Sequence, residues 1–203
     1  YDLPWEGLGW DLAGGRLFFP GWGEIKVGLL GDHQIQNAAT ALLALQELAK
    51  LGWNLPLEVV QRGMKEVNWP GRLEVLSHEP FIILDGGHNQ EGMAALVQSL
   101  HHLQPQLGGE KFTIVFGMLH NKSLDLLDPL LPLAKRFVFT AAESGRLAPM
   151  DPKVLADYVQ SHGLEAVVYG DVGQALKEAS KTAPVCICGS LYLVGSIKRY
   201  LNA

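Results

Sequence analysis

The stretch Phe81-Ile82-Ile83-Leu84-Asp85-Gly86-Gly87-His88-Asn89 joins an apolar run directly to a polar, glycine-rich turn. An apolar run of this length, bounded by turn residues, is typical of a strand that is buried on both faces of a sheet. Similar runs recur along the chain, and we expect four further strands, at residues 112–116, 137–139, 166–169 and 185–188.

Between these runs the apolar residues repeat every three or four positions, as on one face of a helix. One such stripe covers residues 93–103, a second covers residues 154–159 after Asp151-Pro152, and a third covers residues 191–201. Strands that alternate with helices predict right-handed βαβ units. The predicted fold class is therefore α/β, with a Rossmann-like, mostly parallel sheet and helices on both of its faces.

The first part of the chain has a different pattern. Apolar residues on both sides of Gly14-Gly15 predict a β-hairpin that turns at this pair, and alternation over residues 24–30 predicts another strand. Two helices are expected at about residues 34–51, with Gly52 as the C-terminal cap, and 57–67. Because Trp69-Pro70-Gly71 interrupts the second helix, we predict two domains, residues 1–69 and 70–203.

Composition limits the class of protein. Of 203 residues, 48% are hydrophobic and 18% are charged, which indicates a globular chain. The net charge of −5, without a basic cluster, argues against nucleic acid or a membrane surface as the partner. No apolar run approaches the roughly 20 residues of a membrane-spanning helix. Cys186 and Cys188 lie in one apolar run and are expected to be buried free thiols, which suits a cytoplasmic location.

Polar residues follow the predicted strands, at the edge of the sheet where ligands bind in such folds. Asp85 could bind a ribose or form a local turn. Arg72, at the predicted domain junction, could clamp phosphate oxygens or be a surface or helix-capping arginine. His88 could contact a phosphate or a substrate, or be structural, and Lys122 could meet an anionic substrate or point to solvent. Ser190 is equally well a helix N-cap.

The sequence contains no G-x-x-x-x-G-K-[ST] phosphate loop, and no G-x-G-x-x-G motif follows a predicted strand. Ordinary turns with helix caps would explain part of the polar edge. The spacings alone therefore predict an α/β domain with a polar rim, and no more.

Four segments together resemble the folylpolyglutamate synthase and dihydrofolate synthase family of the Mur ligase superfamily. They are LGDHQIQNAATAL at residues 30–42, WPGRLE at 69–74, LDGGHN at 84–89 and GSLYLVG at 189–195. The resemblance covers essentially the whole chain but only the C-terminal half of such an enzyme. Because the chain also begins with Tyr1 and not Met, we expect it to be a piece of a longer protein.

The resemblance implies an ATP-dependent ligase. Such an enzyme phosphorylates the carboxylate of folate or dihydropteroate, and the amino group of L-glutamate then attacks the acyl phosphate. ATP would lie between a P-loop domain and the C-terminal domain. Residues 1–69 would be the tail of the central ATPase domain, and residues 70–203 the C-terminal ligase domain. The resemblance further implies a cytoplasmic monomer that uses small-molecule substrates.

The resemblance also implies roles for individual residues. Asn37 would contact the nucleotide, Arg72 its phosphates and Asp85 the nucleoside. His88, in the same loop as Asp85, is the candidate catalytic residue, and Ser190 would line the site for the incoming amino acid. The P-loop, the Mg²⁺ ligands and a carbamylated lysine would belong to the N-terminal part. No metal ligand is therefore assigned here, and we expect this chain alone to be inactive.

The chain departs from the family pattern at three places. Gly87 and Gln90 replace the usual Ala and Pro, and Asn121-Lys122-Ser123 replaces Asp-Lys-Asp. Gly145-Arg146 replaces a Pro-Arg pair. These changes affect the glutamate and folate side more than the ATP side. Two alternatives stay open: another Mur-superfamily ligase that joins a different acid, and a non-catalytic nucleotide-binding or interaction module.

Overall fold

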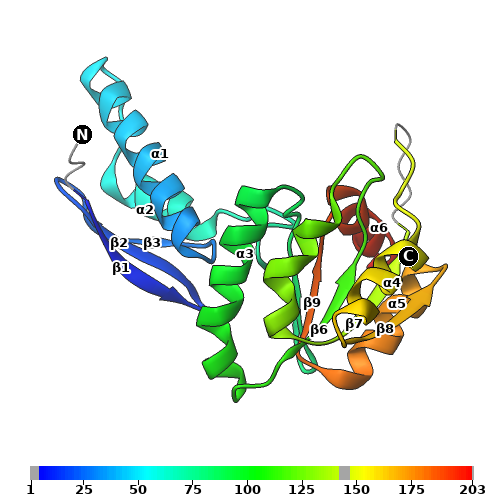
Figure 1. Ribbon diagram of the computed structural model, residues 1–203. Helices are drawn as coiled ribbons and strands as arrows, with labels where there is room; N and C mark the ends of the chain where they lie inside the picture. The colour runs from blue at the N-terminus through cyan, green and yellow to red at the C-terminus, as the bar shows by residue number, and fades with distance from the viewer. Residues whose placement is uncertain (1–4, 142–146, 203) are drawn as a thin grey trace. The chain divides into compact units, whose positions relative to one another are not determined.

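The computed structural model describes residues 5–141 and 147–202 (Figure 1). The chain divides into two compact units, Tyr1–Arg72 and Leu73–Ala203. The predicted boundary lay three residues earlier, between residues 69 and 70. Each unit has its own sheet and its own buried core, and each is described by itself below.

The first unit is an antiparallel sheet that packs against two helices. Its strands are β1 (Glu6–Asp11), β2 (Gly14–Phe19) and β3 (Gly23–Val27), in that order across the sheet. Helix α1 (Asp32–Lys50) contacts β1 and β2, and α2 (Leu57–Glu66) contacts β3. Leu17, Ile25 and Leu42 are fully buried in this unit. The two predicted helices are confirmed to within two residues at each end.

The hairpin of the first unit turns at Leu12-Ala13, so the prediction of a turn at Gly14-Gly15 was wrong. Asp11 closes the turn, because its Oδ1 accepts the backbone N–H of Ala13 at 2.7 Å. Gly14 is the first residue of β2, where a Cβ atom would lie 2.4 Å from the carbonyl oxygen of Val27. Glycine is therefore needed here for the close approach of a neighbouring backbone.

Helix α1 ends in a Schellman motif, which confirms the predicted cap at Gly52. The backbone N–H of Gly52 donates to the carbonyl of Ala49 at 3.0 Å, and that of Trp53 donates to Leu48 at 3.2 Å. Gly52 has a φ of 92°, in the left-handed region that favours glycine.

The second unit contains a six-stranded sheet in the order β4-β5-β9-β6-β7-β8. All neighbouring strands are parallel except β4 and β5. The five predicted strands are confirmed: β5 (Phe81–Leu84), β6 (Phe112–Phe116), β7 (Ala134–Thr140), β8 (Glu165–Tyr169) and β9 (Val185–Cys188). The edge strand β4 (Glu74–His78) was not predicted, because it is polar and only half-buried.

Helices cover both faces of this sheet, as predicted (Figure 1). Helices α5 (Val172–Ala179) and α6 (Leu191–Leu201) pack on the face that carries Val115, Val138 and Ile187. On the other face lie α3 (Gln90–Leu103), α4 (Pro152–Ser161) and the 3₁₀ segment η2 (Leu124–Leu133), which contacts both helices. The remaining 3₁₀ turns are η1 (Gln104–Leu107) and η3 (Ser180–Thr182).

Helix α5 and segment η2 were not predicted. Helix α5 has only eight residues, so its apolar stripe is too short to stand out. Segment η2 contains Pro129 and Pro132, which interrupt any α-helical pattern.

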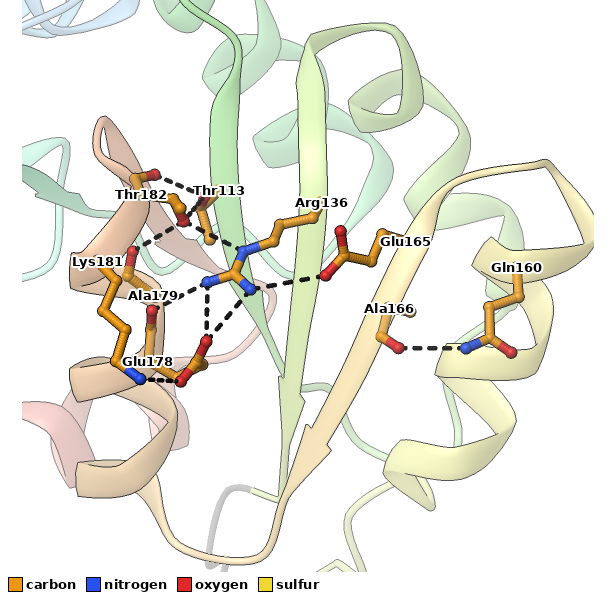
Figure 2. Close-up of polar contacts among 9 residues, drawn as sticks. All are labelled: Thr113, Arg136, Gln160, Glu165, Ala166, Glu178, Ala179, Lys181 and Thr182. Carbon is orange, nitrogen blue, oxygen red and sulfur yellow. Dashed lines mark hydrogen bonds and ion pairs between the residues drawn. The ribbon is translucent and has the colours of Figure 1, made fainter.

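A polar cluster ties together the amino ends of β6, β7 and β8 (Figure 2). Arg136 donates from Nη2 to the carbonyl of Glu178 at 2.9 Å and from Nε to Thr182 Oγ1 at 3.1 Å. Its guanidinium also forms ion pairs with Glu178 at 3.3 Å and with Glu165 at 3.6 Å. Thr113 Oγ1 donates to the carbonyl of Thr182 at 2.7 Å. Because ligands bind at the carboxyl ends of such strands, this cluster is structural.

Cys186 and Cys188 are free thiols with fully buried side chains on β9, as predicted. A hydrogen bond with Cys186, together with burial, raises the pKa of Cys188 well above its usual value. A thiol in that state is a poor nucleophile. Over the residues that the structure describes, no helix is both long and apolar enough to cross a membrane.

Candidate functional site

The loops after β5, β6 and β9 diverge at the carboxyl edge of the six-stranded sheet. They diverge because the helices and turns that follow these neighbouring strands pack on opposite faces of the sheet. Strand β9 lies between β5 and β6, and its helix α6 packs on one face, whereas α3 after β5 and η2 after β6 pack on the other. A parting of this kind leaves a crevice in parallel sheets. A pocket of about 560 Å³ lies there, lined by His88, Leu119, Asn121, Lys122, Leu147, Gly189, Ser190, Leu191 and Tyr192. We call it the edge pocket.

Asp85 shapes the loop after β5. Its buried carboxylate accepts the backbone N–H of Gly87 at Oδ1 (2.7 Å) and that of Leu73 at Oδ2 (2.9 Å). The loop is so tight that a Cβ atom on Gly87 would lie 2.9 Å from Asp85 Oδ1. Asp85 therefore holds the backbone of this loop, and its contact with a nucleoside stays a prediction.

His88 follows in the same loop and lines the edge pocket. Its Nδ1 lies 2.9 Å from the carbonyl oxygen of Gly86. A carbonyl can only accept a hydrogen bond, so Nδ1 carries the proton and Nε2 is the basic nitrogen of the neutral ring. The ring can thus accept a proton at Nε2, although its catalytic role stays a prediction.

The loop after β9 forms another wall of the pocket. Gly189 has a φ of 103° and donates its N–H to the carbonyl of Gly87 at 3.1 Å, which joins two of the loops. Ser190 is the N-cap of α6, since its Oγ accepts the N–H of Tyr192 at 3.1 Å. The interpretation of Ser190 as a cap is confirmed. Only 3% of Ser190 is exposed, and its contact with a substrate stays a prediction.

The loop after β6 carries Lys122, which is half-buried in the pocket wall. A short antiparallel pairing supports this loop, with the N–H of His120 donating to Ala148 (3.1 Å) and that of Met150 to Met118 (2.8 Å). Among the described residues of the lining, Lys122 is the only lysine or arginine, and there is no aspartate or glutamate. With the positive end of α6 nearby, the edge pocket is suited to a carboxylate or another anion.

The five predicted site residues divide between the two units. Asp85, His88 and Ser190 belong to the second unit, which places His88 and Ser190 in one pocket. Asn37 and Arg72 belong to the first unit. Asn37 is exposed on α1 and donates from Nδ2 to Gln34 Oε1 at 3.2 Å, and Arg72 is half-buried. The Gly145-Arg146 pair lies outside the described residues.

Sequence reasoning missed the apolar wall of the edge pocket, formed by Leu119, Leu147, Leu191 and Tyr192. Each of these side chains looks like an ordinary core residue in the sequence. The only available signal was that Leu191 and Tyr192 occur in the GSLYLVG segment already singled out.

The family described as "Mur ligase, glutamate ligase domain" matches residues 71–191 of this chain. The chain belongs to this family. The match begins two residues before the second compact unit and covers every described residue of the edge pocket except Tyr192.

Relatives of this ligase domain include folate enzymes. The chain is 29% identical to a folylpolyglutamate synthase of Lacticaseibacillus casei, over 88% of this chain and 40% of that protein. It is 30% identical to a dihydrofolate synthetase of Saccharomyces cerevisiae, over 95% of this chain and 50% of that protein. The chain thus spans half or less of the length of these relatives.

Solved structures of folate enzymes have the same fold as this ligase domain and its preceding unit. Folylpolyglutamate synthase of Mycobacterium tuberculosis, complexed with ADP and AMPPCP, matches with a TM-score of 0.80 and 25% identity over 100% of this chain and 49% of that chain. The enzyme of Thermotoga maritima matches with a TM-score of 0.79 and 28% identity, over 98% and 46%. These neighbours confirm the predicted α/β fold and the predicted family.

Proposed function

We propose that this chain is the C-terminal part of an ATP-dependent ligase that adds L-glutamate to folate through an acyl phosphate. The activity is that of a folylpolyglutamate synthase, with dihydrofolate synthase activity as an addition. One observation carries the proposal. This chain belongs to the glutamate ligase family, and the described lining of its edge pocket contains one lysine and no acidic residue.

L-glutamate is the proposed ligand of the edge pocket. One carboxylate pairs with Lys122, and the other faces the first N–H groups of α6, where the helix dipole favours negative charge. Ser190 keeps the start of α6 in place through its cap hydrogen bond. Because the described lining contains no acidic side chain, no negative charge there repels the two carboxylates of glutamate.

His88 has the geometry to assist the ligation step. The amine nitrogen of glutamate forms a bond to the acyl carbon, and the bond from that carbon to the phosphate oxygen breaks. Phosphate leaves with the electron pair, and the proton released by the amine moves to Nε2 of His88. The hydrogen bond from Nδ1 to Gly86 orients the ring for this transfer.

Bound ATP with Mg²⁺ supplies the phosphoryl group that activates the acceptor. Asn37, Arg72 and Asp85 are the residues of this chain proposed for the nucleotide. The Asp85 carboxylate, which accepts the backbone N–H groups of Leu73 and Gly87, is the proposed acceptor for a hydroxyl group of the nucleoside. Among the described residues, no group of three His, Cys, Asp or Glu side chains could hold a metal ion. No metal ligand is therefore proposed here.

The proposed enzyme is a monomer and acts in the cytoplasm. Two buried free thiols suit a reducing compartment.

Binding of L-glutamate to the 203-residue chain tests the proposal. In an NMR titration, we expect glutamate to shift the resonances of residues in the edge pocket. Lys122→Met should weaken binding by roughly tenfold, since a charge-assisted contact is lost. Lys135→Met, which removes an exposed lysine at the amino edge of the sheet, is the control. Equal affinity of the two variants would contradict the proposal.

A further inference from the structure

The exposed face of the three-stranded sheet in the first unit carries two positive charges side by side. Arg16 of β2 lies directly opposite Lys26 of β3 in the antiparallel register. Side chains of residues that pair in this way share one face of the sheet, with Cβ atoms about 4.5–5.5 Å apart. Leu17 and Ile25 form the next pair and are buried on the other face. Arg16 and Lys26 are both exposed, and like charges in this arrangement repel each other.

Acidic groups offset this repulsion only weakly. The guanidinium of Arg16 lies 3.9 Å from Glu24 Oε1, and the two side chains are 51% and 50% exposed. An ion pair that is this long and this exposed contributes little. Among the residues that the structure describes, Lys26 takes part in no ion pair. Because the whole chain has a net charge of −5, a generally basic surface does not explain two facing cations.

A pocket of about 360 Å³ lies beside the two cations. Its described lining consists of Asp11, Ala13, Gly14, Gly15, Arg16 and Lys26. The volume is many times the roughly 30 Å³ that one water molecule occupies in the liquid, so a small organic anion fits. Ala13, Gly14 and Gly15 have at most a methyl side chain, which leaves the hairpin backbone open to a ligand.

The charges in this pocket favour a negative ligand. Asp11 is the one acidic residue of the described lining, and its Oδ1 accepts the backbone N–H of Ala13 at 2.7 Å. Its carboxylate is therefore engaged in the hairpin turn. On the other side of Arg16, β1 places Gly9, where a Cβ atom would meet nothing within 4 Å. The Arg16 side chain thus has room to turn toward a ligand.

We propose that Arg16 and Lys26 form a binding site for an oxyanion, which is a carboxylate or a phosphate group. The planar guanidinium of Arg16 donates two parallel N–H bonds to two oxygens, and the ammonium group of Lys26 acts as a compact point charge. An anion between the two cations replaces their repulsion with two attractions. The site lies outside residues 71–191, which match the ligase family, and it does not depend on the proposed function.

Inorganic phosphate and succinate are the probes that test this proposal. In NMR titrations of the 203-residue chain, sodium chloride keeps the ionic strength constant. We expect saturable shifts of backbone resonances in residues 11–16 and at Lys26. The probe that binds more tightly identifies phosphate or carboxylate as the recognised group. Arg16→Met and Lys26→Met should each weaken binding by roughly tenfold, since a charge-assisted contact is lost.

Two further variants separate a specific site from a general effect of charge. Lys50→Met removes an exposed lysine that pairs with Glu47 at the end of α1, and it should leave the affinity within about twofold. Arg16→Lys keeps the charge but lacks the planar fork, so it should retain only part of the affinity.

Thermal melts provide a readout that a purely structural role of Lys26 would not give. In chloride buffer, Lys26→Met should melt at the same temperature as the parent chain or higher, because the repulsion from Arg16 is removed. The tighter probe should raise the melting temperature of the parent chain and leave that of Lys26→Met nearly unchanged. The same melts show that each variant is folded.

The outcomes decide the proposal without affecting the proposed function, which rests on Lys122 in the second unit. Saturable binding that is weakened by Arg16→Met and Lys26→Met, but not by Lys50→Met, supports the oxyanion site. If neither probe shifts these resonances more than chloride does, or if Lys50→Met weakens binding equally, the chain attracts adventitious ions only and the proposal is overturned.

Discussion

Asp85 and Leu73 are joined by a buried hydrogen bond, with 2.9 Å between the Leu73 backbone nitrogen and Asp85 Oδ2. Leu73 is the first residue of the second unit, and it is the only non-glycine residue in the described chain with a positive φ, 48°. A left-handed leucine costs about 1–2 kcal/mol. The Asp85 carboxylate thus holds the strained Leu73 in place. Through its hydrogen bond with Gly87, the same carboxylate also holds the loop that contributes His88 to the edge pocket.

Asp85→Ala should lower the free energy of unfolding by about 2–4 kcal/mol. The change leaves the N–H groups of Leu73 and Gly87 buried without their carboxylate acceptor. Urea denaturation provides the measurement. Asp151→Ala, which removes an exposed helix cap, is the control and should cost about 1 kcal/mol. If the two variants lost similar amounts of unfolding free energy, the prediction that Asp85 stabilises the fold more than the Asp151 cap would be wrong.

Leu73→Gly should be no more destabilising than Leu73→Ala. Both variants lose the same buried side chain, but only glycine removes the strain of the positive φ. At an ordinary position glycine is worse than alanine by roughly 0.5–1 kcal/mol. Chemical denaturation measures the unfolding free energy of both variants. A clearly higher value for Leu73→Ala than for Leu73→Gly would contradict the prediction.

Gly189→Ala should destabilise the second unit by more than about 1 kcal/mol and disturb the edge pocket. A Cβ atom there would lie 2.6 Å from the ring of Phe116, at a φ of 103°. The matched control is Gly63→Ala in α2, where a Cβ atom meets nothing within 4 Å, and it should stabilise by about 0.5–1 kcal/mol. Melting curves of both proteins measure the difference.

Thr140→Val should raise the melting temperature or leave it unchanged. The Oγ1 atom of Thr140 is buried at the end of β7 and has no hydrogen-bond partner among the residues that the structure describes. A buried hydroxyl without a partner costs about 1–3 kcal/mol, and valine has nearly the same shape. Calorimetric melting of the variant and the parent chain tests this, and a marked loss of stability would reveal a partner for the hydroxyl.

The Arg136 cluster should make stability depend on pH through Glu178. The hydrogen bond from Lys181, followed by that from Arg136, holds the pKa of Glu178 below its usual value of 4.5. A carboxyl group whose pKa is lower in the folded state stabilises the fold above its unfolded pKa. This stabilisation is lost as the pH falls from about 4.5 through the folded pKa.

Urea denaturation at several acidic pH values measures this effect, with Glu178→Gln as the comparison. The difference in unfolding free energy between parent and variant should be constant above about pH 5.5 and should shrink as the pH falls below 4.5. A difference that did not change with pH would contradict the role of the Glu178 charge.

Several features could be predicted from local pattern alone. The five parallel strands are continuous apolar runs, and Gly52 and Ser190 occupy cap positions that depend only on nearby backbone. The hairpin turn could not be placed from Gly14-Gly15, because the need for glycine there comes from Val27, a residue of another strand. Strand β4 was missed for a related reason, since it is held mainly by its pairing with β5.

By itself, the sequence determined the α/β class and the family, because these depend on periodicity and on motifs that are contiguous in the chain. Only the tertiary structure decided that Asp85 supports Leu73, and that Lys122, Ser190 and Tyr192 share one pocket. The physical reason is strand order. Because β9 lies between β5 and β6, loops that are about 30 to 100 residues apart in the sequence meet at one edge of the sheet.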